Sequence, residues 1–165
     1  MGHPSDVVGV SELVPFQGVE QVSTAKAVVQ KWAVVHDLLI SVTSAGTVRD
    51  EDWQAFVQAL LTEPITKYLA TSLGKADVTS VQRKQAADIL RSRNIRMAVV
   101  TNDTFVRGLV TAVGWLGANV QSFPWTDTTT ALQYLAVTGK MAERSLATLA
   151  KLRREVEALE RRNRE

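Results

Sequence analysis

The chain has 165 residues, which is long enough for one domain with appended segments. Its hydrophobic content of 45% and charged content of 22% are ordinary for a globular protein, and the absence of cysteine excludes disulfides and thiolate chemistry. Because the formal net charge is only +2 and basic residues alternate with acidic ones, no concentrated basic face is expected, and therefore no nucleic-acid binding.

Residues 1–24 mix proline, glycine and valine without a sustained period, and they are expected to form a loosely ordered N-terminal arm. Val7–Val10 or Leu13–Phe16 are the parts of this arm that can dock on the body. The first residues lack the cationic start and apolar run of a secretory signal. No apolar stretch approaches the roughly 20 residues that span a bilayer, so a cytoplasmic protein without a membrane span is expected.

The body is expected at residues 25–138 and begins with a β-hairpin. Lys26–Val35 and Leu38–Thr43 are β-branched runs on either side of a short polar break at His36 and Asp37. Asp50 is then expected to cap a helix that stops at Pro64. The apolar residues of this helix repeat with helical spacing, at Trp53, Phe56, Val57, Leu60 and Leu61.

A strand is expected over Tyr68–Leu73, followed by a helix that begins at Thr79. Gln82 stands three residues after Thr79, and the pair is typical of a capping box. Along this helix, Ala86, Ile89 and Leu90 are expected to face inward, and Arg83, Lys84, Arg91 and Arg93 outward. Arg96–Thr101 contains the run Met97–Val100, which is apolar on both sides and indicates a central strand covered on both faces.

Asn102, Asp103 and Thr104 are expected to cap a third helix. This helix carries the apolar residues Phe105, Leu109, Ala112, Val113 and Leu116. A last strand at Val120–Phe123 precedes a helix that is capped by Asp127 or Thr128 and carries Leu132 and Leu135. Strands that alternate with amphipathic helices favour an α/β fold, with a mostly parallel sheet of about five strands that starts with the hairpin.

Residues 140–165 contain neither glycine nor proline and predict one long C-terminal helix. Residues spaced 3, 4, 3, 4 along this helix form a heptad seam that consists of Leu149, Leu152, Val156, Leu159 and Asn163. The alternative is an amphipathic helix that packs on its own domain. The narrow stripe and the charges around it favour an exposed, coiled-coil-like seam, which predicts a homo-oligomer or docking to a partner's helix.

Residues 28–137 resemble the SpoIIAA-like branch of STAS domains, which are related in fold to anti-sigma-factor antagonists and stand near lipid-binding SEC14 domains. The segments that carry the resemblance are the hairpin into Gly46, the Thr47–Trp53 helix entry, the Gln82–Arg83 helix start, Met97–Asp103 leading into Val106–Ala112, and Phe123. The resemblance implies a STAS-like fold and a regulatory, protein-binding role.

Regulatory STAS domains carry a phosphorylatable hydroxyl at the start of the second helix, within an Asp-Ser-Ser-Gly-like motif. The counterpart here is Asp77–Val81, which has no glycine after its hydroxyl residues. The resemblance makes Thr79 and Ser80 the candidate phosphorylation sites, since a phosphate is tolerated at a helix N-terminus. Helix capping by Thr79 is the alternative.

The residues for catalysis are sparse. The only histidines are His3, in the arm, and His36, which is expected in a surface turn, so a Ser-His-Asp triad has no plausible base. Metal-ligand spacings are absent, and Gly74-Lys75 lacks the spacing of a phosphate-binding loop. We therefore expect neither an enzyme nor a bound metal or cofactor.

Polar residues gather at the expected carboxyl ends of the strands, where open α/β sheets bind ligands. This rim consists of Thr71, Ser72, Thr101, Asn102, Asp103, Thr104 and Arg107. The alternative is that Asn102 or Asp103 caps the third helix and Thr101 satisfies backbone groups. Trp125 is either an exposed interface anchor or folds back over the sheet edge.

Two functions are compatible with these features. The leading prediction is a non-enzymatic interaction, regulatory or scaffold module that binds protein partners, with the C-terminal helix as an oligomerising or docking element. The alternative is a small-ligand or lipid-binding domain that uses the rim from Thr101 to Thr104.

Overall fold

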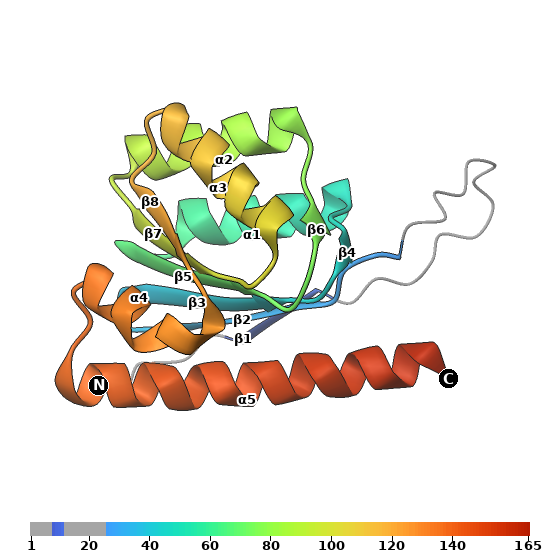
Figure 1. Ribbon diagram of the computed structural model, residues 1–165. Coiled ribbons are helices and arrows are strands. Elements are labelled where there is room, and N and C mark those ends of the chain that lie inside the picture. Colours follow the sequence, from blue (N-terminus) through green and yellow to red (C-terminus); the bar gives the residue numbers. More distant parts are fainter. Residues whose placement is uncertain (1–7, 12–25) are drawn as a thin grey trace.

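The computed structural model describes residues 8–11 and 26–165, and it has three layers. A β-sheet forms the middle layer (Figure 1). The helices α1 (Asp50–Thr62), α2 (Ser80–Ser92) and α3 (Thr104–Trp115) cover one face. The helices α4 (Thr128–Tyr134) and α5 (Gly139–Arg164) cover the other. The predicted α/β class is therefore confirmed, together with the long C-terminal helix.

The sheet has six strands in the order β1-β2-β3-β5-β7-β8. The two pairings at the β1 edge are antiparallel, and the other three are parallel. A second, two-stranded sheet pairs β4 with β6. The strands are β1 (Val8–Ser11), β2 (Gln30–Val35), β3 (Leu38–Thr43), β4 (Gly46–Thr47), β5 (Lys67–Ser72), β6 (Ala76–Asp77), β7 (Arg96–Val100) and β8 (Val120–Phe123).

The N-terminal edge of the sheet contains the predicted hairpin and one further strand. β2 and β3 pair from Val35 opposite Leu38 outward, and His36 in the turn adopts a φ of 54°. β1 adds an antiparallel strand to β2, within the segment expected to be a loose arm. The rest of that arm, residues 1–7 and 12–25, lies outside the described residues.

Two of the predicted helix caps are present and two are absent. No side chain caps α1, and neither Asp127 nor Thr128 makes a side-chain capping bond at the start of α4. Thr79 caps α2 as predicted, because its Oγ1 accepts from the Gln82 amide at 3.1 Å and the Gln82 side chain accepts from the Thr79 amide at 3.0 Å. Asp103 caps α3 through a 3.0 Å bond from the Val106 amide. The prediction that Asp50 caps α1 is wrong. Asp50 is the first helical residue, and its carboxylate accepts a 3.3 Å bond from the Gln82 side chain.

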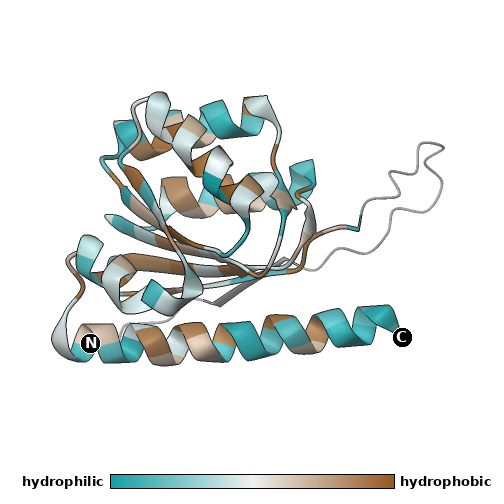
Figure 2. Cartoon of the chain, in the orientation of Figure 1, coloured by the Kyte–Doolittle hydropathy of each residue, from teal (hydrophilic) through white to brown (hydrophobic). Residues whose placement is uncertain are grey.

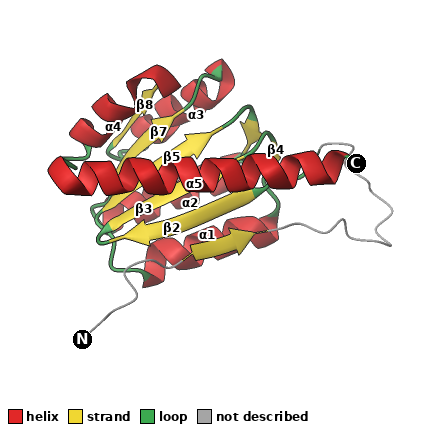
Figure 3. Ribbon diagram, turned by 90° about the horizontal axis from the view of Figure 1, so that it is seen from below, coloured by secondary structure: helices red, strands yellow, loops and turns green. Residues whose placement is uncertain are grey.

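The predicted heptad seam is buried within the domain and is not exposed for a partner. Leu149, Leu152, Val156 and Leu159 pack on the sheet beneath β2 and β3, while Asn163 is exposed near the end of the helix. Figure 3 shows α5 lying across this face of the sheet. The expectation of an exposed seam is therefore wrong for these four residues.

Charges beside the seam explain how α5 is held. Lys31 on β2 pairs with Glu155 at 3.1 Å, and Lys26, just before β2, pairs with Glu160 at 3.2 Å. Both glutamates flank the apolar stripe at positions where a coiled coil would use them to select a partner. Here the two glutamates instead pair with lysines of the same chain, on β2 and just before it. Figure 2 colours only the last turns of α5 as continuously hydrophilic.

Each face of the sheet has its own apolar core. One core joins α4 and α5 to the sheet, and the other joins α1 and α2 to the opposite face. The helix α3 is the exception, because Val106 is its one buried residue. None of the helices in the described part of the chain is long and apolar enough to cross a bilayer.

Candidate functional site

The helix α3 is strongly apolar in composition and also contains residues that lower its helix stability. It carries seven apolar side chains on almost all sides, yet it also contains Gly108 and Gly114, each of which costs a helix about 1 kcal/mol relative to alanine. Neither glycine is required by close packing. A Cβ on Gly108 would meet nothing within 4 Å, and one on Gly114 would make an ordinary 3.8 Å contact. The sequence therefore lowers the stability of α3 without a packing reason.

The helix α3 turns only some of its apolar residues inward. Leu109 and Val113 line the space between α3 and the sheet, whereas Phe105 and Leu116 are each 43% exposed. Because apolar residues follow one another closely along α3, its sequence is compatible with more than one inward face. The face in use carries Val106, Leu109, Val110 and Val113, at i, i+3, i+4 and i+7.

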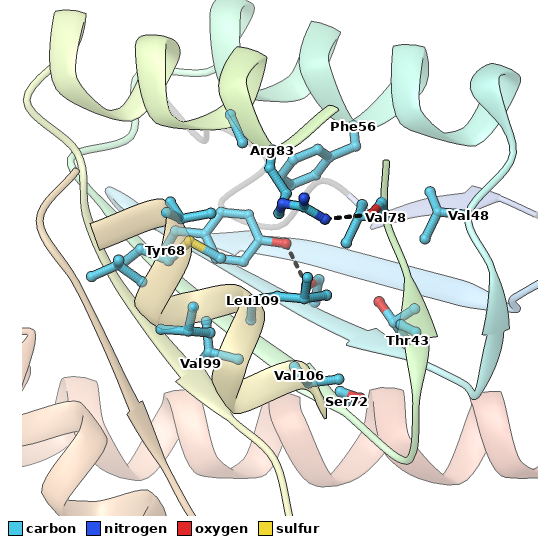
Figure 4. A pocket seen from close by; sticks show the side chains of 18 of the residues that line it. Thr43, Val48, Phe56, Tyr68, Ser72, Val78, Arg83, Val99, Val106 and Leu109 are labelled. Atoms are coloured by element: carbon cyan, nitrogen blue, oxygen red, sulfur yellow. Dashed lines mark hydrogen bonds between the residues drawn. The ribbon is translucent and has the colours of Figure 1, made fainter. Parts of the chain in front are cut away.

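Beneath this face lies an apolar pocket of about 170 Å³ (Figure 4). The sheet forms its floor, α1 and α2 form one wall, and α3 forms another. The largest side chains in its lining are Trp53, Phe56, Leu60, Tyr68, Leu90, Met97 and Leu109. Phe56 stands edge-on to Tyr68 with ring centroids 5.4 Å apart, and Trp53 lies 5.3 Å from Phe56. The walls are thus mainly hydrocarbon and aromatic.

A few polar groups interrupt this apolar lining. The hydroxyls of Ser41 and Tyr68 are hydrogen-bonded at 2.6 Å, and both residues are buried. Burial raises the pKa of Tyr68 above its ordinary value, so the phenol keeps its proton at neutral pH. Thr71 donates to the Ser41 carbonyl at 2.8 Å. Arg83 enters from α2 and donates to the Val78 carbonyl at 3.0 Å.

The carboxyl of Asp52, near the start of α1, also lines the pocket and is buried. Its pKa is raised to about 6, mainly by burial and in part by the neighbouring Glu51, while Arg49 acts in the opposite direction. A titratable group displaced toward neutrality in a cleft is typical of functional sites. The pocket therefore combines apolar walls with a small set of ionisable and hydroxyl groups.

The predicted rim is only partly brought together. Ser72, Asn102 and Asp103 line a second, more polar groove of about 470 Å³ at the strand ends, whereas Thr71 faces the apolar pocket. Thr101 is fully buried, and its Oγ1 accepts from the Asp103 amide at 3.1 Å. Thr104 and Arg107 line neither space. The residues that the sequence predicts to form one rim therefore do not form a single site.

The polar groups of the strand-end groove are largely used for internal contacts. Trp125 folds back over the sheet edge, where its Nε1 donates to the Ser72 carbonyl at 2.9 Å and its amide to Asn102 Oδ1 at 3.0 Å. Arg153 of α5 stacks 4.3 Å above the Trp125 ring and pairs with Glu157 at 2.8 Å. This groove therefore holds α5 and the α4 region to the strand ends, and the apolar pocket is the better candidate site.

The remaining candidate residues lie apart from both spaces. Thr79 and Ser80 stand at the exposed start of α2, with the Thr79 hydroxyl committed to the capping box. His36 is exposed in the hairpin turn. Among residues 8–11 and 26–165, no three His, Asp or Glu side chains come together as a potential metal site.

Two residues of functional interest escape the sequence pattern. Arg83 was expected to face outward, but its guanidinium lines the apolar pocket. Trp115, which ends α3, is 84% exposed. Helical spacing from Ala86 and Leu90 places Arg83 near the inner face, and this was the available signal. Trp115 gave none, because tryptophan is buried more often than not.

Comparison with known proteins adds no assignment. No family model matches this chain, and no curated protein matches it either, so membership of the SpoIIAA-like STAS branch stays a prediction that rests on the residues quoted above.

Proposed function

We propose that this chain is a binding protein that takes a small apolar molecule into the pocket beneath α3. The observation that carries the proposal is the pocket of about 170 Å³ with its aromatic and aliphatic lining. Apolar cavities of about 150 Å³ bind benzene-sized molecules. The pocket therefore suits a single ring or a short alkyl chain, held by dispersion and exclusion of water. The sequence favours the strand-end rim for ligand binding, whereas the proposal places it under α3.

The weak helix α3 supports the proposal because a ligand needs a way in. A helix with one buried residue and two unneeded glycines opens at low cost compared with α1 or α2, whose apolar faces belong to a core. Its C-terminal end is tied to α2 by Arg91, which donates to the Leu116 carbonyl at 3.1 Å. Opening therefore involves α3 while the sheet and α1 stay in place.

Hexanol is a suitable neutral probe, because Trp53 lines the pocket and its fluorescence responds to a bound ligand. Saturable quenching or enhancement by hexanol is expected in the wild-type protein. Ala86→Phe places a ring in the pocket and should abolish the response, whereas Ala55→Phe on the exposed face of α1 should not. Ala86→Leu is a milder filling variant should the larger one fail to fold. Equal responses in all folded variants would refute the proposal.

A protein partner is the second candidate function, and the exposure of Trp115 is the observation that favours it. Tryptophan, when it anchors an interface, contributes a large share of the binding energy. Leu116 is exposed beside it. The specific form proposed is self-association of two chains through this end of α3. Sedimentation velocity should then show a dimer that Trp115→Ala dissociates, and a concentration-independent 18.1 kDa species would contradict it.

The SpoIIAA-like interpretation remains part of this proposal. It is supported by the chain order of hairpin, then helix and strand in alternation, which the described residues share with the expected architecture. A phospho-switch would act at Ser80, since Thr79 is needed for the cap. Phosphate at Ser80 would lie at the positive end of α2. Mass spectrometry of protein from the native host checks this, and an unmodified Asp77–Val81 peptide under all growth conditions would contradict it.

A further inference from the structure

Arg83 is an unusual member of the pocket lining because its charge has no ion-pair partner among the residues that the structure describes. Arginine carries five N–H donors, and the Val78 carbonyl accepts from one nitrogen, Nη1, at 3.0 Å. None of the ion pairs among residues 8–11 and 26–165 involves Arg83. The arginines at the C-terminal end of α2 have other partners. Arg91, in the last turn, pairs with Asp88, and Arg93, which follows the helix, donates to the carbonyls of Leu60 and Glu63.

The hydroxyl pair in the pocket supplies a further donor. Ser41 and Tyr68 together have two hydroxyl hydrogens, and the 2.6 Å bond between them uses one. The second remains for an acceptor. Tyr68 on β5 and Arg83 on α2 both line the pocket, and Figure 4 shows their side chains together with aliphatic residues of α3 and the sheet.

A guanidinium and a hydroxyl donor that line the same apolar pocket are complementary to a carboxylate that carries an apolar body. A guanidinium binds carboxylates in a fork geometry, and such charge-assisted bonds are about twice as strong as neutral ones. Resting on the proposed function, we propose that the ligand is a small organic acid, such as a short-chain fatty acid or an arylcarboxylate. Arg83 and the Tyr68–Ser41 pair hold its carboxylate, and the apolar walls hold its body.

The carboxyl of Asp52 bears on this selectivity because it lines the same pocket. The charged neighbours that shift the pKa of Asp52 are Glu51 and Arg49. When ionised, Asp52 repels an incoming carboxylate. Asp52→Asn should therefore strengthen the binding of an acid and leave the binding of an alcohol of the same chain length unchanged.

The test compares hexanoate with hexanol by isothermal titration at one pH and ionic strength. Both share one apolar body, and wild-type protein should bind hexanoate about tenfold or more tightly, as a hydrogen bond to a charged group predicts. Arg83→Met keeps a long apolar stem and should remove this preference while hexanol binding stays within about twofold. Lys84→Met, at the exposed neighbouring position, removes the same charge outside the pocket and should change neither affinity.

The outcomes separate this inference from the proposed function. Hexanol binding without a preference for hexanoate, or a preference that survives in Arg83→Met, would overturn the carboxylate assignment and leave the pocket intact. Binding of neither probe to wild-type protein would overturn both. If Arg83→Met does not fold, the salt dependence of binding to the wild-type protein provides the test. The affinity for hexanoate should fall as the sodium chloride concentration is raised, whereas the affinity for hexanol should not. A hexanoate affinity that does not depend on salt would overturn the carboxylate assignment.

Discussion

Replacing Leu152 by alanine tests whether α5 belongs to its own domain. Leu152 is 2% exposed, between α5 and the sheet. Substitution of a buried leucine by alanine costs about 2–5 kcal/mol, through lost transfer energy and the cavity left behind. A loss of about 3 kcal/mol is expected. With a urea m-value of about 2 kcal/mol per molar, the unfolding midpoint should fall by about 1.5 M.

Circular dichroism during urea denaturation measures this shift, and Leu146 provides a matched control on the same helix. Leu146 is 37% exposed, so Leu146→Ala should cost less than about 1 kcal/mol. If the packing is internal, the Leu152→Ala midpoint does not change between two protein concentrations about twentyfold apart. Equal midpoints for the two variants, or a wild-type midpoint that rises with concentration, would refute the internal packing of the seam.

Three further predictions concern single positions. The pKa of Asp52 is raised to about 6, mainly by burial, so between about pH 4 and pH 6 the folded state holds a proton that the unfolded state has released. The free energy of unfolding should therefore fall by up to about 3 kcal/mol as the pH rises through this range. Asp52→Asn should flatten this dependence in urea titrations, and an unchanged slope would contradict the assignment. Gly46→Ala should destabilise the protein strongly, because φ is 144° and a Cβ would stand 2.3 Å from a backbone oxygen. Gly108→Ala should instead stabilise it by up to about 1 kcal/mol. Melting temperatures that shift in the same direction in both variants would contradict this prediction. Thr79→Ala should cost about 1 kcal/mol through loss of the capping box, and Ser80→Ala next to it should cost little, as thermal melts will show.

The elements that the sequence predicts well are those specified by neighbours in the chain. The hairpin around His36, the α2 capping box at Thr79 and the Asp103 cap of α3 depend on residues within a few positions of one another, and all are present. The cap at Asp50 failed because a carboxylate at the first helical position binds a side chain from α2 instead. Turns and helix caps can be predicted from neighbouring residues, whereas competing contacts from residues distant in the sequence cannot.

The placement of α5 and the position of the site depend on distant residues. A spacing of 3 and 4 serves equally for a coiled coil and for a helix lying on a sheet, and the ion pair from Lys31 to Glu155 joins residues 124 apart in sequence. The pocket likewise draws its lining from residues between Gln30 and Val120. No window of sequence contains it. The orientation of Arg83 follows only once α2, α3 and the sheet are assembled.

The internal packing of α5 also sets an order of events during synthesis. Domains begin to fold from the N-terminal side as they leave the ribosome. The sheet face beneath β2 and β3 is apolar, and its cover is residues 139–164, which emerge after every strand has been made. Until then that face is open to water and to other chains. A chain that ends before α5 would therefore expose one apolar face of the sheet, to which chaperones bind and through which chains aggregate.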